Sequence, residues 1–139
     1  MNLKRTLKGE KATRAFAREI AGSLKGKNVL MYGTLGAGKT FFVKAVADFF
    51  GCAETSSPTF TLHQRYEGDV TIHHFDLYRL ESPFELDNIG FYDFLERGET
   101  CFIEWADKFN LKDELENYVE ITITVDSPDT RTICVSEKG

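Results

Sequence analysis

The chain has 139 residues, of which 42% are hydrophobic, 28% are charged and 13% are aromatic. These proportions predict one compact domain over residues 1–139 and exclude a disordered or fibrous protein. No run approaches the roughly 18 apolar residues of a membrane-spanning helix, and residues 1–11 lack the apolar core of a signal peptide. The three cysteines are scattered without metal-type spacing, which is typical of a reducing compartment. We therefore expect a cytoplasmic protein that is not bound to a membrane.

The formal net charge of −5 is unevenly distributed along the chain. Residues 1–28 carry eight lysines or arginines against two glutamates, whereas the rest carries nine basic and twenty acidic residues. An acidic body disfavours extensive nucleic-acid binding, because neutralising phosphates needs a positive surface. The basic N-terminal part is compatible with a local contact to RNA or to an acidic partner, and equally with an ordinary solvated helix surface.

The first part of the chain predicts the order helix, strand, glycine-rich loop and helix. Apolar residues recur at four-residue steps over residues 10–24, which is typical of an amphipathic helix. Residues 28–32 form a short apolar run of the kind found in a buried strand. A second helix is expected over residues 39–50, since Gly51 follows it as a terminating residue.

Two hairpins are predicted further along. Residues 61–66 and 70–75 alternate on either side of a Gly-Asp turn. Residues 119–125 and 132–135 alternate around a Ser-Pro-Asp turn. We expect the strands of each hairpin to be antiparallel.

Between the hairpins, Ser82 is a capping residue followed by proline and, three places on, by Glu85, so a short helix is expected to start there. Residues 101–103 are apolar and predict one more buried strand. The combination of parallel-type and hairpin strands predicts an α/β fold, with a mixed parallel and antiparallel sheet flanked by helices.

The glycine-rich loop matches the phosphate-loop pattern G-x-x-x-x-G-K-[ST]. Its glycines allow successive N–H groups to turn inward and form an anion nest at the positive end of the following helix. The lysine can reach the β- and γ-phosphates, and the hydroxyl of the last residue can bind a bridging Mg²⁺. The expected nucleotide-binding residues are Gly33, Thr34, Leu35, Gly36, Ala37, Gly38, Lys39 and Thr40, with Phe41 directly after them.

Hydrolysis of a nucleotide also requires an acidic group near the metal ion. Two apolar strands end in such a group, namely Asp76 and Glu104. Because α/β sheets bind ligands at the carboxyl edge of their parallel strands, both side chains are candidates for this role. The alternative for each is an ordinary strand-end charge that faces water.

Four linked runs resemble a known family. GTLGAGKT, SPTFTL, HFDLYRL and IEW occur in an order and spacing that closely resemble the bacterial TsaE-type ATPases, over about residues 10–135. The resemblance implies ATP and magnesium as cofactors, and the proteins TsaB and TsaD as partners. It further implies that hydrolysis lets the complex turn over as TsaD transfers a threonylcarbamoyl group to a tRNA adenosine, with tRNA contacted indirectly through the complex.

Residue by residue, the resemblance implies that Lys39 is the phosphate lysine, that Thr40 supplies the metal hydroxyl and that Glu104 binds the metal. It places Asp76 among the acidic residues of the site. We therefore expect Lys39, Asp76 and Glu104 to be catalytic, and Thr40, Asp76 and Glu104 to hold the metal. The implied enzyme is a slow ATPase that depends on its partners.

Further positions have weaker parallels. Thr59 resembles a switch-like threonine near the γ-phosphate, and is otherwise a turn residue after a proline. Glu10 and Arg131 align with positions that flank the nucleotide base. Trp105 either shapes the site or a partner surface, or packs in the core, while His74 is interpreted as a local hydrogen-bonding residue.

The sequence departs from the family at two positions. Thr34 stands where relatives commonly carry Asp or Glu, and Phe41 stands where they carry a second Thr. Losing a carboxylate removes a polar contact near the triphosphate, and Phe41 is expected to pack inside its helix. Binding is expected to survive both changes, whereas their effect on the hydrolysis rate stays open.

Three other functions remain open at this point. A small-molecule or nucleotide kinase shares the loop but usually adds an arginine-rich lid, and no lid-sized insertion is visible. A GTPase usually carries an N-K-x-D-like segment, which residues 106–109 do not supply. A nucleotide-sensing interaction module without meaningful turnover is compatible with the small size and the acidic body.

Overall fold

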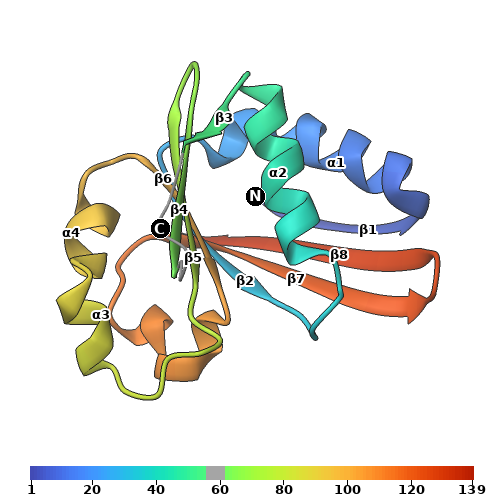
Figure 1. The fold of residues 1–139 in the computed structure, drawn as a ribbon. Helices are drawn as coiled ribbons and strands as arrows, with labels where there is room; N and C mark the ends of the chain where they lie inside the picture. The colour runs from blue at the N-terminus through green and yellow to red at the C-terminus, as the bar shows by residue number, and fades with distance from the viewer. Residues whose placement is uncertain (56–61) are drawn as a thin grey trace.

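The computed structural model describes residues 1–55 and 62–139, and within these ranges eight strands form one twisted sheet (Figure 1). The strand order is β1-β8-β7-β2-β6-β5-β4-β3. The strands are β1 (Asn2–Lys8), β2 (Asn28–Tyr32), β3 (Ala53–Thr55), β4 (His63–Glu67), β5 (Thr71–Asp76), β6 (Thr100–Glu104), β7 (Tyr118–Ser127) and β8 (Thr130–Lys138). The helices are α1 (Gly9–Leu24), α2 (Lys39–Phe49), α3 (Phe84–Asn88) and α4 (Phe91–Glu96), with 3₁₀ turns η1 (Ala106–Phe109) and η2 (Leu111–Asp113).

The centre of the sheet is parallel and its two sides are antiparallel. β2 pairs in parallel with both β6 and β7, and β6 pairs in parallel with β5. On one side, β7, β8 and β1 are antiparallel neighbours, and on the other side β5, β4 and β3 are. The predicted mixed sheet and both predicted hairpins are therefore confirmed for the described residues.

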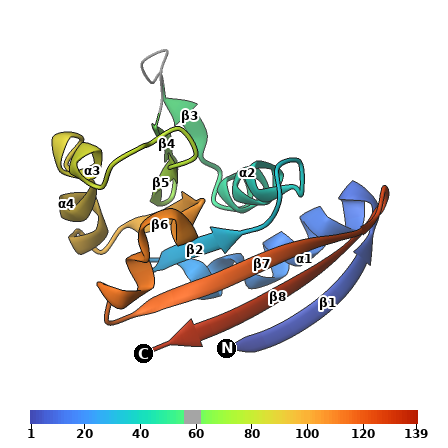
Figure 2. The ribbon, with the colours of Figure 1, turned by 90° about the horizontal axis from the view of Figure 1, so that it is seen from below.

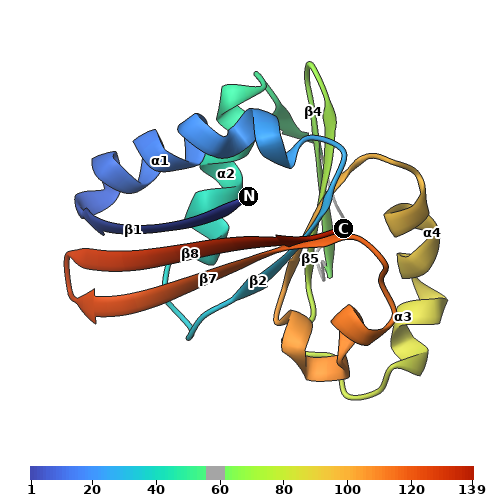
Figure 3. The same ribbon diagram turned by 180° about the vertical axis from the view of Figure 1, so that it is seen from behind.

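Helices cover both faces of the sheet (Figure 1, and Figure 3 from behind). One core cluster packs α1 and α2 against the sheet, and a second packs α3, α4 and η1 against the opposite face. β6 is buried along its whole length. Because successive side chains of a strand alternate between faces, Phe102 joins the first cluster, while Cys101 and Ile103 join the second.

The predicted helix over residues 10–24 is observed as α1, with its apolar stripe buried at Phe16, Ile20 and Leu24. The strand over residues 28–32 is observed with the same bounds as β2. The short helix expected to start at Ser82-Pro83 is observed as α3, but it begins at Phe84 with Pro83 in the N-cap position, and Ser82 Oγ accepts a hydrogen bond of 3.2 Å from the backbone N–H of Phe84. Within the described ranges, no helix is long and apolar enough to cross a membrane.

Five elements were not predicted from the sequence: the strands β1 and β3, the helix α4, and the 3₁₀ turns η1 and η2. β1 is an edge strand of mostly exposed residues, three of them basic, and it lies beside β8 from the far end of the chain (Figure 2). In this pairing Leu3 is the partner of Val135. β3 has only three residues. Neither strand carries a local apolar alternation. Pairing with the distant strand β8 fixes β1, and pairing with the next strand, β4, fixes β3.

The turn between β4 and β5 leaves no room for a side chain at Gly68. A Cβ atom there would lie 2.5 Å from the carbonyl oxygen of Gly51 and 2.7 Å from Cα of Cys52. Since these neighbours are backbone atoms, we expect Gly68→Ala to lower the free energy of unfolding by about 1–3 kcal/mol.

Gly22→Ala is the matched control. Gly22 lies in α1, and no neighbouring atom lies within 4 Å of the position that an added methyl group would take, so this change should stabilise by about 0.5–1 kcal/mol. Urea denaturation measures both, and equal effects of the two variants would contradict the prediction.

Candidate nucleotide and metal site

The glycine-rich loop connects the carboxyl end of β2 to the first turn of α2. Gly36 and Gly38 have φ angles of +82° and +110°, which residues with a side chain rarely adopt. The Ala37 N–H donates to the Thr34 carbonyl at 3.0 Å, so the loop closes into a tight turn. The sequence-predicted order of strand, loop and helix is confirmed, and the loop lies at the carboxyl edge of the parallel strands.

Lys39 is folded back over its own loop. The residue is 4% exposed, and Nζ donates a hydrogen bond of 2.6 Å to the Gly33 carbonyl. The same ammonium group lies 3.8 Å from the centre of the Trp105 ring, a cation–π distance. Burial lowers the pKa of Lys39, and the negative charges of Glu104 and Asp76 partly oppose this shift.

The two acidic strand ends lie side by side. Asp76 of β5 is the register partner of Glu104 of β6, so both side chains leave the sheet on the same face. Asp76 is half-buried, and its Oδ1 accepts a hydrogen bond from the backbone N–H of Tyr78 at 3.0 Å. The sequence expectation that these two carboxylates share the edge of the sheet with the loop agrees with this geometry.

Glu104 is a buried carboxylate with two donors. Thr40 Oγ1 donates to Glu104 Oε2 at 2.8 Å, and His74 Nε2 is hydrogen-bonded to the same oxygen. Burial by itself raises the pKa of the Glu104 carboxyl, but these two bonds and the Lys39 charge outweigh it and hold the pKa below its usual value. Both bonds and the Lys39 charge therefore favour the ionised form of Glu104.

The side chains of Thr40, Asp76 and Glu104 offer ligands that suit a hard divalent cation. A hydroxyl and two carboxylates offer only oxygen, which Mg²⁺ prefers, and Mg²⁺ usually completes its shell with phosphates and water. Within residues 1–55 and 62–139, no group of three or more His, Cys, Asp or Glu side chains is arranged to hold a metal. An ion at Thr40 and Glu104 would thus need ligands from a nucleotide or from water.

A cavity of about 340 Å³ opens beside the loop. Glu10, Thr13, Phe41 and Arg131 contribute to its walls, together with loop residues 36–38. Arg131 also connects the loop to the turn between β7 and β8, because its Nε donates to the Ala37 carbonyl at 2.9 Å while Nη1 donates to the Ser127 carbonyl at 2.9 Å. Glu10 and Arg131, expected on either side of a base, thus lie in one cavity next to the loop.

The remaining sequence-predicted residues lie in varied surroundings. Leu35 is 76% exposed at the tip of the loop, and Thr34 is also exposed. Phe41 was expected to pack inside its helix, but it is half-buried in the cavity wall, with the Arg14 guanidinium 5.4 Å from its ring centre. Thr59 lies outside the described residues.

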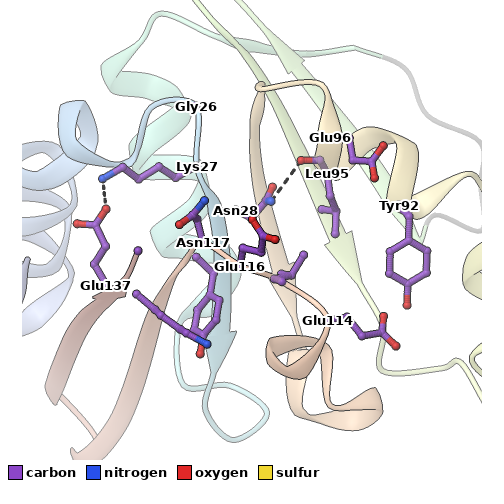
Figure 4. Close-up of a pocket in the computed structure, with 14 residues that line it drawn as sticks. Gly26, Lys27, Asn28, Tyr92, Leu95, Glu96, Glu114, Glu116, Asn117 and Glu137 are labelled. Atoms are coloured by element: carbon purple, nitrogen blue, oxygen red, sulfur yellow. Dashed lines mark hydrogen bonds and ion pairs between the residues drawn. The ribbon is translucent and has the colours of Figure 1, made fainter.

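A larger cavity of about 590 Å³ lies away from the loop, at the amino ends of β2 and β7 (Figure 4). Its labelled lining is rich in carboxylates, and the ion pair between Lys27 and Glu137 crosses its edge. Glu96, Glu114 and Glu116 also line it. This excess of negative charge would repel a triphosphate, so volume alone does not identify the nucleotide site.

Three contacts of the site were not foreseen from the sequence: the ring of Trp105 against Lys39, the bond between His74 and Glu104, and the bond from Arg131 to the Ala37 carbonyl. Trp105 has a φ angle of +61°, which is uncommon for a bulky residue. The position of Trp105 directly after Glu104 was the one sign in the sequence that it could lie in the site. No local sequence pattern predicts the strained turn that directs its ring to Lys39.

Comparisons with known proteins identify the family and the fold of the chain. The family model described as "Threonylcarbamoyl adenosine biosynthesis protein TsaE" matches residues 7–133. Among solved structures, the crystal structure of Bacillus subtilis YdiB superposes with a TM-score of 0.76 and 29% sequence identity, over 100% of this chain and 87% of that one. The likeness supports the mixed α/β fold described above.

Several curated relatives carry the name tRNA threonylcarbamoyladenosine biosynthesis protein TsaE. The Rickettsia conorii protein is 45% identical over 73% of this chain, and the Treponema pallidum protein is 39% identical over 81% of it. The matched part spans 60% of the R. conorii protein and 83% of the T. pallidum protein. With a family model that matches nearly its whole length, the chain belongs to the TsaE family.

Proposed function

We propose that residues 1–139 form a single ATPase domain that binds ATP with Mg²⁺ and supports threonylcarbamoyladenosine modification of tRNA. The observation that carries the proposal is the contact of 2.8 Å between Thr40 and Glu104, directly after the phosphate loop and beside Lys39. It joins the hydroxyl and the carboxylate that a nucleotide-bound metal requires. The family name shared by the relatives supports the role in tRNA modification.

In this proposal the backbone N–H groups of the loop and the Lys39 ammonium bind the phosphates and stabilise the charge that gathers on their oxygens. Lys39 must leave the Gly33 carbonyl to do so, which a more strongly accepting phosphate oxygen favours. Bound Mg²⁺ would supply further neutralisation of the triphosphate. Asp76 and Glu104 would hold that ion and orient the attacking water, and no covalent intermediate on the protein is needed.

Low basal turnover is part of the proposal. Within the described residues, the nearest arginine to the loop is engaged, because Arg131 donates its hydrogen bonds to backbone carbonyls such as that of Ala37. We infer that TsaB and TsaD complete the site and bring it to tRNA, in the cytoplasm. The three free cysteines support a reducing compartment.

The cavity beside the loop is the proposed site of the adenine ring. Arg131→Ala removes the bond to the Ala37 carbonyl and part of the cavity wall, so we expect about tenfold weaker binding of both ATP and ADP. Isothermal titration calorimetry measures both affinities. Arg97→Ala, which removes an arginine packed on Phe94, is the matched control and should bind normally. A loss confined to ATP would contradict a role on the base side.

The deciding experiment is reconstitution of the tRNA modification with TsaB and TsaD. The protein should be needed for repeated rounds of product formation with ATP. The Lys39→Ala variant should not support these repeated rounds. Equal support from a non-hydrolysable ATP analogue would favour the nucleotide-sensing module instead. Transfer of labelled phosphate to an acceptor other than water would favour a kinase.

A further inference from the structure

His74 lies directly behind the two acidic strand ends. It is 5% exposed in the middle of β5, where its register partner on β6 is Phe102. Glu104 comes two residues after Phe102, so the side chains of His74 and Glu104 share one face of the sheet. This is the face that packs against α2, since Thr40 of that helix reaches Glu104.

The contacts of Glu104 are concentrated on one oxygen. His74 Nε2 and Thr40 Oγ1 both bond to Oε2, and Oε1 accepts no hydrogen bond from the residues that the structure describes. Two donors on one oxygen fix the plane of the carboxylate. The second oxygen is left as a ligand for a partner that the protein chain itself does not supply.

The chemistry of the carboxylate assigns the donor role of His74 Nε2. An ionised carboxylate only accepts hydrogen bonds, so Nε2 must carry the proton. Nδ1 is the one fully buried side-chain nitrogen or oxygen in the described ranges that lacks a partner. The opposite tautomer would set a lone pair against the carboxylate and bury an unpaired N–H. Because Nδ1 contributes no bond, the polar contribution of this buried ring is its bond to Glu104.

We propose that His74 is a positioning residue, whose Nε2–H holds the Glu104 carboxylate so that Oε1 stays available to Mg²⁺ in the nucleotide complex. The inference rests on the proposed function of the site. His74 and Thr40 both bond to Oε2 of Glu104. The imidazole ring of His74 is itself placed by strand β5. Outer hydrogen-bond partners of metal ligands commonly change metal affinity by about 10–100-fold.

The test compares His74→Gln with His74→Asn. Glutamine brings an amide N–H to about the position of Nε2, whereas asparagine reaches only about the position of Nδ1. Binding of the non-hydrolysable analogue AMPPNP is measured by calorimetry in EDTA and at increasing MgCl₂. We expect His74→Asn to need about tenfold more Mg²⁺ for tight binding and to bind normally in EDTA, whereas His74→Gln should stay close to the wild type in both conditions.

Three results would overturn the inference. The first is a normal Mg²⁺ requirement in His74→Asn, and the second is an equal loss of binding in EDTA, which indicates a merely structural role. The third needs no variant: a long-range ¹H–¹⁵N spectrum of the wild type, with its three histidines, that shows His74 protonated on Nδ1 alone. If the wild type binds AMPPNP in neither condition, the proposed function itself fails, which distinguishes that case from the others.

Discussion

Glu104→Gln is expected to lower the rate of ATP hydrolysis at least about 100-fold, because it removes a buried charge from beside the metal hydroxyl. Glutamine has nearly the same shape and still offers an oxygen to Thr40 and His74, so the fold should persist. Affinity for ATP in EDTA should stay within about threefold of the wild type, since the phosphate loop is unchanged. The Mg²⁺-dependent part of the affinity should fall.

The measurement is phosphate release by the reconstituted complex, with calorimetry of nucleotide binding beside it. Glu96→Gln is the matched control, because Glu96 is an exposed carboxylate at the end of α4, away from the loop. Lys39→Ala should also abolish turnover, but it should weaken ATP binding in EDTA as well, since Nζ would contact phosphate directly. A Glu104→Gln protein that hydrolyses ATP normally would remove the acidic group from the proposed mechanism.

The parts of this molecule that could be predicted from the sequence are those with local causes. β2, the glycine loop and α2 follow one another along the chain, and each glycine of the loop is required by a backbone angle at its own position. The expectation that Asp76 and Glu104 meet needed only the rule that parallel strands end at one edge. The observed register, with these two residues opposite each other, agrees with it.

The contacts that sequence analysis missed join distant segments. The bond of Arg131 to Ala37 spans 94 residues, and the bond of His74 to Glu104 spans 30. Whether two such side chains meet depends on strand register, and a shift of one residue would move His74 to the opposite face. His73 illustrates this, because its side chain is bonded to Glu99 and His63 instead.

His63 gives a second strong prediction, on stability in mild acid. Its ring stacks on Phe75 with 4.4 Å between ring centres, and its Nε2 lies 2.8 Å from His73 Nδ1. Burial lowers the pKa of His63 to about 4, with smaller contributions from the charges of His73, Arg65 and Arg97. The folded protein therefore excludes a proton that the unfolded chain binds.

The sign of the effect follows from this difference in proton binding. In the unfolded chain His63 takes up its proton near pH 6.5, whereas in the folded protein it does so only near pH 4. The stabilisation is fully present above pH 6.5 and is lost as the pH falls through this window. Between pH 7 and 5 the free energy of unfolding should drop by about 1–2 kcal/mol, allowing for partial solvent screening. Most carboxylates stay ionised in this range, so the histidine effect can be isolated.

Urea denaturation of the wild type and of His63→Phe at pH 7, 6 and 5 measures this loss. Phenylalanine keeps the stacking on Phe75 but has no proton to bind, so the variant should lose about 1 kcal/mol less than the wild type over the same range. It is expected to be less stable at pH 7, because His73 Nδ1 loses its partner. Parallel pH dependences for the two proteins would show that His63 is protonated alike in the folded and unfolded states. If the free energy of unfolding of the variant no longer depends on pH in this range, the acid sensitivity of the protein arises in the aromatic layer between β4, β5 and α4. This layer lies on the face of the sheet opposite α2.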